Sequence, residues 1–359
     1  MKILLAAWHL KDFNVGLGRY VRCLIEALGA VDRDNEYEIV MPVGQPPFTP
    51  HPNIRYRTVR IPIFKRRVWE QVVPWLCDRH DILHLPYDSC VIRKRGKLVV
   101  TIHDVKPLLF NTGRYTRPLL ERFLVPDRRA VIDHVVTVST ASSLDIQRLL
   151  GFPAQRMTVI YPGVDLQRFR PTDASNKIDS PYVLAVTGAD PTKNMETLIQ
   201  AFARLPLSLR EGHKLILAGD LRRRPELGRL IEELGIGPQT VFAGIVSDDQ
   251  LIELYQHAAV FVFPSRYEGF GLPVLEAMAC GCPVICSNAS SLPEVAGHAA
   301  LLVDPTDVEG FAQDMERVLT DAALRQSMRE RGLAQAAQFP WERTARETIA
   351  VYQNVLSQT

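Results

Sequence analysis

Two glutamates and a helix start share one short stretch in the second half of the chain. The stretch covers residues 263–281 and has the sequence FPSRYEGFGLPVLEAMACG. Glu268 stands in a glycine-rich turn, and Pro273 has the fixed φ and the missing N–H that suit the beginning of a helix. Gly281 ends the predicted helix. The pattern predicts a binding loop that leads into a helix.

The start of such a helix can hold an anion or the hydroxyls of a sugar. Its first N–H groups lack partners within the helix, and the aligned peptide dipoles add partial positive charge there. Glu268 would face this place from the loop, and Glu276 from the first turn of the helix. Each glutamate alone also has a simpler interpretation, Glu276 as a complement to the helix dipole and Glu268 as a solvated turn residue. The longer sequence string decides between these interpretations.

That string resembles the pattern of retaining glycosyltransferases of family four, which have the GT-B fold. Glu268 and Glu276 are separated by seven residues, and the similarity continues to Gly297. The resemblance implies that Glu268 holds hydroxyls of a donor sugar and that Glu276 holds the ribose of its nucleotide. The turn and the helix start complete this part of the predicted donor-binding set: Gly269, Phe270, Gly271 and Leu272.

Length and composition indicate an ordinary globular protein with two domains. The chain has 359 residues, of which 47% are hydrophobic and 23% are charged. Its six cysteines are too sparse for a disulfide scaffold, so we expect a reducing, cytoplasmic location. Cys280, Cys282 and Cys286 lack the spacing of a metal site, and we expect no metal and no cofactor. No apolar run reaches the roughly 18 residues of a membrane span, so any membrane contact should be peripheral.

The net charge of +2 hides a difference between the two halves of the chain. Residues 1–170 contain 26 Lys and Arg against 16 Asp and Glu, a balance of +10, whereas residues 171–359 contain 16 against 24, a balance of −8. A basic half can meet nucleic acid, anionic lipid or a phosphorylated acceptor, or it can be a solvated surface. A basic and aromatic stretch at 64–69 fits contact with the inner face of an anionic membrane, and it equally fits a helix that packs Trp69 inward.

The beginning of the chain predicts a strand at 2–7, a loop at 16–20 and a helix after it. Gly16 and Gly18 fall short of a dinucleotide fingerprint because Val21 occupies the third glycine position. In the resembled family this loop approaches the donor phosphates or the acceptor. Arg19 is therefore a candidate phosphate contact, with a plain surface position as the alternative.

His103 follows a buried strand predicted at 98–102, and strand ends are where open α/β sheets bind ligands. It matches a histidine that stands beside the donor sugar in many members of the resembled family. Asp104 would orient its ring or cap the loop. A helix predicted at 116–123 borders the place where the acceptor should enter.

Strands alternate with helices through both halves, which predicts two parallel sheets. We expect α/β architecture of the GT-B type, two Rossmann-like parallel-sheet domains facing across a cleft. Residues 1–170 would form the acceptor-binding domain and residues 171–340 the donor-binding domain. A final helix at 341–359 would cross back to the first domain.

One segment departs from the family pattern. Many members carry an arginine and, a few residues later, a lysine after the first strand of the second domain, and both hold the leaving diphosphate. Lys193 matches the lysine, but Gly188 stands roughly where the arginine is expected. A departing diphosphate needs charge compensation. We expect Arg266 to assist Lys193, with residues 222–224 as the alternative.

These observations predict a retaining, metal-independent glycosyltransferase with His103, Glu268 and Lys193 as catalytic residues. The segment at 101–107 looks most like mannosyltransferases of surface polysaccharide assembly, so GDP-mannose is the expected donor and a UDP-sugar the alternative. The acceptor would be a hydroxyl of a glycan or of a lipid-linked glycan. A sugar-nucleotide epimerase or phosphorylase of the same fold is a rival, as is a nucleic-acid-binding protein, which would leave the string from Glu268 to Glu276 unexplained. We therefore expect no nucleic-acid partner.

Overall fold

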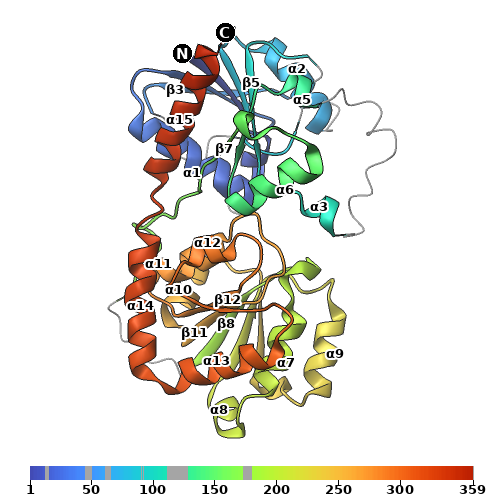
Figure 1. Ribbon diagram of the computed structural model, residues 1–359, viewed down its shortest axis with the longest axis vertical. Coiled ribbons are helices and arrows are strands. Elements are labelled where there is room, and N and C mark those ends of the chain that lie inside the picture. Colours follow the sequence, from blue (N-terminus) through green and yellow to red (C-terminus); the bar gives the residue numbers. More distant parts are fainter. Residues whose placement is uncertain are drawn as a thin grey trace. The chain divides into compact units, whose positions relative to one another are not determined.

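The computed structural model describes residues 1–12, 16–44, 51–60, 66–89, 91, 93–110, 128–172 and 180–358. The chain forms two compact units (Figure 1). Unit 1 comprises Met1–Gly163 together with Trp341–Thr359, and unit 2 comprises Val164–Pro340.

Unit 1 contains a sheet of seven parallel strands in the order β3-β2-β1-β4-β5-β6-β7. The order reverses beside β1, which pairs with β2 on one side and with β4 on the other. The inner strands β1, β4, β5 and β6 are short and mostly buried, as a sheet covered on both faces requires, whereas the edge strand β3 is largely exposed. The strands are β1 (Lys2–Ala6), β2 (Glu36–Met41), β3 (Ile54–Thr58), β4 (Ile82–Leu85), β5 (Lys97–Ile102), β6 (His134–Thr137) and β7 (Met157–Val159).

The helices of unit 1 connect these strands. In α6, the Ser139 hydroxyl caps the first turn by accepting from the Ser142 N–H at 3.0 Å, and Gly151 ends the helix with φ of 67°. The helices are α1 (Gly16–Val31), α2 (Arg66–Leu76), α3 (Lys106–Leu109), α5 (Arg128–Val131), α6 (Thr140–Leu150) and α15 (Trp341–Ser357), with 3-10 turns η1 (Trp8–Asp12) and η2 (Ala154–Arg156).

The last helix, α15, belongs to unit 1 although it follows unit 2 in the chain. It packs along α1, and Tyr352 reaches the buried His84 of β4 with 2.6 Å between the hydroxyl and Nδ1. The other ring nitrogen of His84 lies 2.9 Å from the Thr101 hydroxyl, so both nitrogens are satisfied. Burial lowers the pKa of His84 to about 3, and the ring is neutral at pH 7.

Unit 2 repeats the plan with six parallel strands in the order β10-β9-β8-β11-β12-β13. The order reverses beside β8, which pairs with β9 and with β11. The strands are β8 (Tyr182–Val186), β9 (Lys214–Ala218), β10 (Thr240–Gly244), β11 (Val260–Phe263), β12 (Val284–Ser287) and β13 (Leu301–Val303). The predicted fold class, two Rossmann-like parallel-sheet domains, is confirmed.

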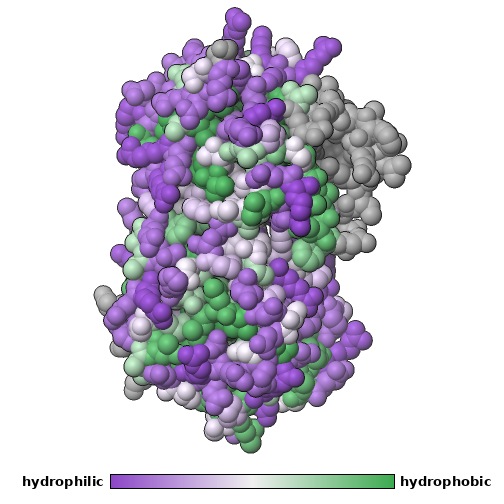
Figure 2. Space-filling model, viewed as in Figure 1, coloured by the Kyte–Doolittle hydropathy of each residue, from purple (hydrophilic) through white to green (hydrophobic). Residues whose placement is uncertain are grey.

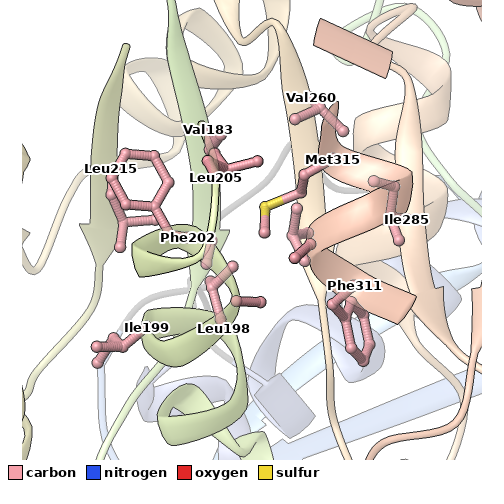
Figure 3. Packing of buried hydrophobic residues seen from close by; sticks show 14 of the residues in the cluster. Val183, Leu198, Ile199, Phe202, Leu205, Leu215, Val260, Ile285, Phe311 and Met315 are labelled. Atoms are coloured by element: carbon pink, nitrogen blue, oxygen red, sulfur yellow. The ribbon is translucent and has the colours of Figure 1, made fainter. Parts of the chain in front are cut away.

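The core of unit 2 forms where two helices cover one face of its sheet (Figure 3). Leu198 and Phe202 of α7, with Phe311 and Met315 of α13, pack in one cluster with strand residues such as Val183. The helices of the unit are α7 (Met195–Ala203), α8 (Leu207–Gly212), α9 (Pro225–Glu233), α10 (Asp248–His257), α11 (Leu272–Ala279), α12 (Leu292–Ala296), α13 (Val308–Thr320) and α14 (Ala322–Ala336), with 3-10 turns η3 (Pro191–Lys193) and η4 (Gly237–Gln239).

The division between the units falls at Gly163, seven residues before the predicted boundary at 170. The reason is that the intervening residues are bound to unit 2. The Val164 N–H donates to the Phe339 carbonyl at 2.9 Å, and Arg168 forms ion pairs with Asp248 at 2.7 Å and Asp249 at 3.0 Å.

One sequence prediction needs correction, and others fall outside the described residues. The loop expected at 16–20 is the first part of α1, because Gly18 and Tyr20 are buried on the inner side of that helix. The predicted helix at 116–123 lies outside the described residues, as do Phe64 and Lys65 of the basic stretch.

Candidate active site

The site in unit 2 lies where the order of its sheet reverses. Lys193 follows β8 and Glu268 follows β11, and these two strands are neighbours. The carboxyl ends of neighbouring parallel strands meet at one edge of the sheet, and a reversal of strand order opens a crevice there. The topology therefore brings together two residues that are 75 positions apart in the sequence.

Lys193 and Glu268 form an ion pair at this edge. The Lys193 ammonium donates to Glu268 Oε1 at 2.8 Å and lies 4.7 Å from the centre of the Phe263 ring. The Ser265 hydroxyl donates to the same carboxylate oxygen at 2.6 Å. Both charged side chains are mostly buried, so neither screening nor free rotation weakens the pair as it would on an open surface.

The backbone around Glu268 is held by hydroxyls from the segment after β12. Ser290 and Ser291 donate to the Glu268 carbonyl at 2.6 and 3.0 Å, and Ser291 also donates to the Phe270 carbonyl at 2.5 Å. These bonds satisfy loop carbonyls that have no strand partner. The carboxylate of Glu268 is thus presented from a fixed loop.

The turn that carries Lys193 is fixed by its two polar neighbours. Asp190 accepts from the Thr192 N–H at 2.9 Å, which begins η3. Asn194 adopts a left-handed conformation with φ of 58° and donates to the carbonyls of Pro264 at 3.0 Å and Pro305 at 2.7 Å. Asparagine tolerates this conformation better than most residues. The turn is therefore tied directly to the loop that follows β11.

Helix α11 begins and ends where the sequence predicts. Gly271 precedes it with φ of 119°, and a Cβ there would lie 2.7 Å from a methyl carbon of Leu292, so only glycine fits. Glu276 is the fifth residue of the helix, which places it in the second turn instead of the predicted first turn. Its side chain is buried within unit 2.

The cations considered as partners of Lys193 differ in their availability. Arg266 is exposed, and within the described part of the chain its guanidinium makes no ion pair. Arg222 is held by Asp220 through two bonds of 2.8 Å. Arg224 is buried between Glu196 and Glu226. These contacts favour Arg266 over residues 222–224 as the second cation that would assist Lys193.

Gly188 leaves open space at the position where the resembled family has an arginine. A Cβ added there would meet no atom within 4 Å. The contrast is Gly219, where φ is 142° and a Cβ would lie 2.1 Å from the Thr187 carbonyl oxygen. Packing explains the glycine at 219, whereas nothing in the structure explains the glycine at 188.

A cavity of about 510 Å³ lies over the carboxyl ends of β9 and β10. Strand β9 is the neighbour of β8, the strand that precedes Lys193. Leu221, Phe242 and Ile245 give it apolar walls, and Phe242 and Ile245 are largely exposed. Asp220 and Arg222 supply its polar groups. A flat, partly polar ring system fits such a cavity.

In unit 1, His103 follows β5 and is held by its surroundings. Its Nε2 lies 3.1 Å from the Pro86 carbonyl oxygen, which only accepts, so Nε2 carries the hydrogen and Nδ1 is the accepting nitrogen. The ring of Tyr20 packs edge-on at 4.5 Å between centres. Burial lowers the pKa of His103 to about 4, against a smaller opposing effect of the Pro86 carbonyl. Asp104 caps the following turn through the Lys106 N–H at 2.9 Å.

The other residues predicted in unit 1 lie together in one helix. Gly16, Gly18 and Arg19 all belong to the beginning of α1. Gly18 is buried, and Gly16 has φ of 47° at the helix start. Their predicted contact with the donor stays a prediction.

The cysteines near α11 are buried thiols. Burial raises the pKa of Cys280 and of Cys286 to about 12 and raises that of Cys282 further. Among the residues that the structure describes, no three His, Cys, Asp or Glu side chains gather in a way that could hold a metal ion. None of the described helices combines the length and hydrophobicity that a membrane span needs.

Sequence reasoning missed Ser265 and Asn194, which fix Glu268 and Lys193. Ser265 is a single polar residue at the end of an apolar strand, and its role depends on a residue three positions later. Asn194 offered a better indication, because an asparagine just before a helix is often in a left-handed or capping conformation.

The fold and the paired charges at the strand reversal define a nucleotide-sugar-transferring enzyme of GT-B architecture. The family described as Glycosyltransferase Family 4 matches residues 15–168, and Glycosyl transferases group 1 matches residues 169–335. The chain belongs to the glycosyltransferases that these two family models describe. These enzymes use a nucleotide-sugar donor and a glycan acceptor, as the sequence predicts.

Curated relatives agree with this assignment. The O-antigen chain mannosyltransferase B of Escherichia coli is 32% identical, over 98% of this chain and 99% of that protein. The serotype-specific mannosyltransferase WbdA of Escherichia coli is 34% identical over 72% of this chain, and the match spans 34% of that larger protein. Among solved structures, the sucrose-phosphate synthase of Thermosynechococcus elongatus superposes with a TM-score of 0.79 at 24% identity, covering all of both chains. At this sequence identity, the similarity shows a shared fold and nothing further.

Proposed function

We propose that this glycosyltransferase moves mannose from GDP-mannose to a hydroxyl of a glycan or lipid-linked glycan, with retention of anomeric configuration and without a metal. The observation that carries the proposal is the ion pair of Lys193 and Glu268 at the strand reversal of unit 2. It offers a cation for a diphosphate beside a carboxylate for sugar hydroxyls. The names of the two curated relatives support mannose as the transferred sugar.

Charge compensation of the diphosphate would come from Lys193 and Arg266. On donor binding, the Lys193 ammonium would exchange one of its contacts with Glu268 for a phosphate oxygen, and the carboxylate would turn to sugar hydroxyls. The exposed guanidinium of Arg266 is two residues from Glu268 in the same loop. Such preorganised charges stabilise a departing anion with little rearrangement.

The cavity over β9 and β10 would hold the nucleobase. Its apolar walls suit the faces of a ring, and two of its three charged residues, Asp220 and Arg222, suit the edge of guanine. Arginine pairs well with the O6 and N7 acceptors of guanine, and a carboxylate accepts from its N1–H and exocyclic amine. Uracil lacks the adjacent O6 and N7 acceptors that suit Arg222 and the exocyclic amine that would donate to Asp220, which supports GDP over UDP.

Retention without a nucleophile would follow from departure and attack on the same face of the sugar. In this step the bond from the anomeric carbon to the diphosphate breaks, the acceptor oxygen forms the new bond, and the departing phosphate takes the acceptor's proton. No side chain then acts as the general base. His103 is neutral, and its Nδ1 would accept a hydrogen bond from a sugar hydroxyl.

The experiment is a transfer assay with GDP-mannose, UDP-glucose and ADP-glucose, with and without a mannan-oligosaccharide acceptor and with EDTA. We expect acceptor-dependent release of GDP, unchanged by EDTA, and an α-linked product from the α-linked donor by NMR. Release that does not need the acceptor would favour the epimerase or phosphorylase alternative. Preference for a UDP-sugar would contradict the proposed base recognition.

Peripheral contact with an anionic membrane is part of the same proposal, because it would bring the enzyme to a lipid-linked acceptor. The +10 balance of residues 1–170 and the exposed Trp75 and Leu76 of α2 support it. Within the stretch at 64–69, Trp69 is buried and Arg66 pairs with the buried Glu70 at 3.2 Å, so these two side chains serve the fold. Co-sedimentation with phosphatidylglycerol vesicles at low and high salt tests this part.

A further inference from the structure

A second cavity lies in unit 1, at the edge of the sheet where the strands begin. It has a volume of about 640 Å³ and is lined by the residues just before β4, β5 and β6 and by Leu356 of α15. His103 follows the other end of β5, and six strand residues separate the two places by about 20 Å. Figure 1 shows both chain termini at the end of unit 1 that holds this cavity, and Figure 2 shows that this end is largely hydrophilic. Within unit 1, the cavity is thus separate from His103.

The lining of this cavity is rich in positive charge. Arg79 precedes β4, and Lys94, Arg95 and Lys97 lie before or at the start of β5. The lining also contains two carboxylates, but each already accepts from the chain. Asp81 accepts from the Lys2 N–H at 2.8 Å, and Asp133 accepts from the Leu98 N–H at 2.6 Å and pairs with Lys94. The four cations therefore exceed the two carboxylates by two charges.

His80 adds a buried group that the protein leaves unsatisfied. Its side chain is only 7% exposed, and its Nδ1 lies 3.1 Å from the Asp78 carbonyl oxygen, which only accepts, so Nδ1 carries a hydrogen. His80 lines the cavity, and its buried Nε2 has no hydrogen-bond partner in the described part of the chain. A buried polar atom without a partner is costly, and a ligand would relieve that cost.

The backbone builds this cavity rigidly. The Lys97 N–H donates to the Asp81 carbonyl at 2.8 Å and joins the two loops that line it. Gly96 has φ of 76°, and a Cβ there would lie 2.6 Å from the same carbonyl oxygen, so the close approach requires glycine. Arg95 lies over the ring of Trp75 with 5.5 Å from its central carbon to the ring centre. The cationic groups are therefore carried by loops whose conformation is fixed.

We infer that this cavity binds a phosphate group. A phosphate anion complements the excess of positive charge and offers several acceptor oxygens to the arginines and lysines. The unsatisfied Nε2 of His80 would form a hydrogen bond with the bound phosphate group. The phosphate belongs either to a soluble phosphorylated molecule or to a lipid headgroup. The inference is independent of the donor and acceptor proposed above.

The test is a titration of the full-length protein with inorganic phosphate at constant ionic strength, followed by the ring nitrogen resonances of its nine histidines in NMR spectra. The His80→Gln variant identifies the resonances of His80. We expect a saturable change of the His80 resonances as phosphate is added, because His80 lines the cavity.

The decisive variant is Arg79→Gln with Lys97→Gln, which removes two cavity cations without touching His80. It should weaken phosphate binding by about tenfold or more. The matched control is Arg55→Gln with Arg60→Gln, which removes two exposed arginines of the same unit outside the cavity and should change nothing. Thermal unfolding shows whether each variant is folded, and transfer to a soluble acceptor should be unchanged in all of them.

Vesicles distinguish the two sources of the phosphate. Saturable binding of inorganic phosphate supports a soluble ligand. Binding to phosphatidylglycerol vesicles but not to phosphatidylcholine vesicles, lost in the cavity variant and kept in the control, supports a headgroup. Absence of both, or equal losses in the cavity variant and the control, overturns the inference.

Discussion

The two units share one plan and differ in the chemistry at the ends of their strands. In both sheets, two strands lie on one side of the first strand, and the others lie on the opposite side, four in unit 1 and three in unit 2. Unit 2 places a charged pair, Lys193 and Glu268, at the reversal and fixes it with serine hydroxyls. Unit 1 places a neutral histidine, His103, after β5 and fixes it with a carbonyl and an aromatic ring. Under the proposed function, the same topology would serve an anionic ligand in one unit and neutral hydroxyls in the other.

The net charge of each half of the chain would suggest the opposite assignment, with the anionic ligand bound by residues 1–170. The half with a balance of +10 carries the neutral histidine, and the half with a balance of −8 carries the lysine assigned to the diphosphate. Net charge describes the long-range field, whereas a buried pair at the end of a strand acts at contact distance. Under the proposed function, local geometry is therefore a better guide than net charge to where the diphosphate would bind.

The largest expected effect comes from removing the charge in unit 2. Lys193→Ala should lower turnover by roughly 10²–10³, because it removes a preorganised cation from the departing diphosphate. It should also leave Glu268 uncompensated, so thermal unfolding must accompany the kinetics. Lys214→Ala is the matched control, since Lys214 lies in the same unit and its ammonium donates to the Pro238 carbonyl, at 2.9 Å. Near-normal turnover in Lys193→Ala would move the role to Arg266.

A smaller effect should follow from the neutral histidine of unit 1. The pKa of His103 in the folded protein is about 4, below its ordinary value of 6.5, so the unfolded state takes up the proton first as the pH falls. Its contribution to stability is complete above pH 6.5 and is lost as the pH falls from 6.5 to about 4. The unfolding temperature should therefore fall more between pH 7 and pH 4.5 in the wild type than in His103→Gln. An equal fall in unfolding temperature in the wild type and in His103→Gln would show that His103 is not buried as a neutral ring.

The structure shows which features the sequence was able to predict. Apolar runs and glycines located the strands and α11, because burial and backbone conformation depend on neighbouring residues. The environment of Arg224 was not predictable, since its partner Glu196 lies 28 residues away on another helix. A loop was predicted where α1 begins, because Gly16 and Gly18 favour a loop locally. Gly18 is buried against the core, and this packing stabilises the helix instead.

The smallest expected effect would come from restoring a charge at Gly188. The open space there predicts that Gly188→Arg folds normally. A second cation near Lys193 should tighten binding of the nucleoside diphosphate by a few-fold, about the effect of one partly exposed ion pair. Calorimetry with GDP measures it, and Gly188→Gln is the control for size without charge. Equal affinities in the two variants would place position 188 away from the diphosphate.

The central claim is that Glu268 holds the transferred sugar and Glu276 the nucleotide, and calorimetry with GDP on two variants tests it most directly. Glu276→Ala should weaken GDP binding by roughly 10- to 150-fold, the effect of losing a charge-assisted hydrogen bond to ribose. Glu268→Ala should leave GDP affinity nearly unchanged and lower turnover, because the sugar that it positions is absent from GDP. Equal losses of GDP affinity in both variants, or full turnover in Glu268→Ala, would contradict the account.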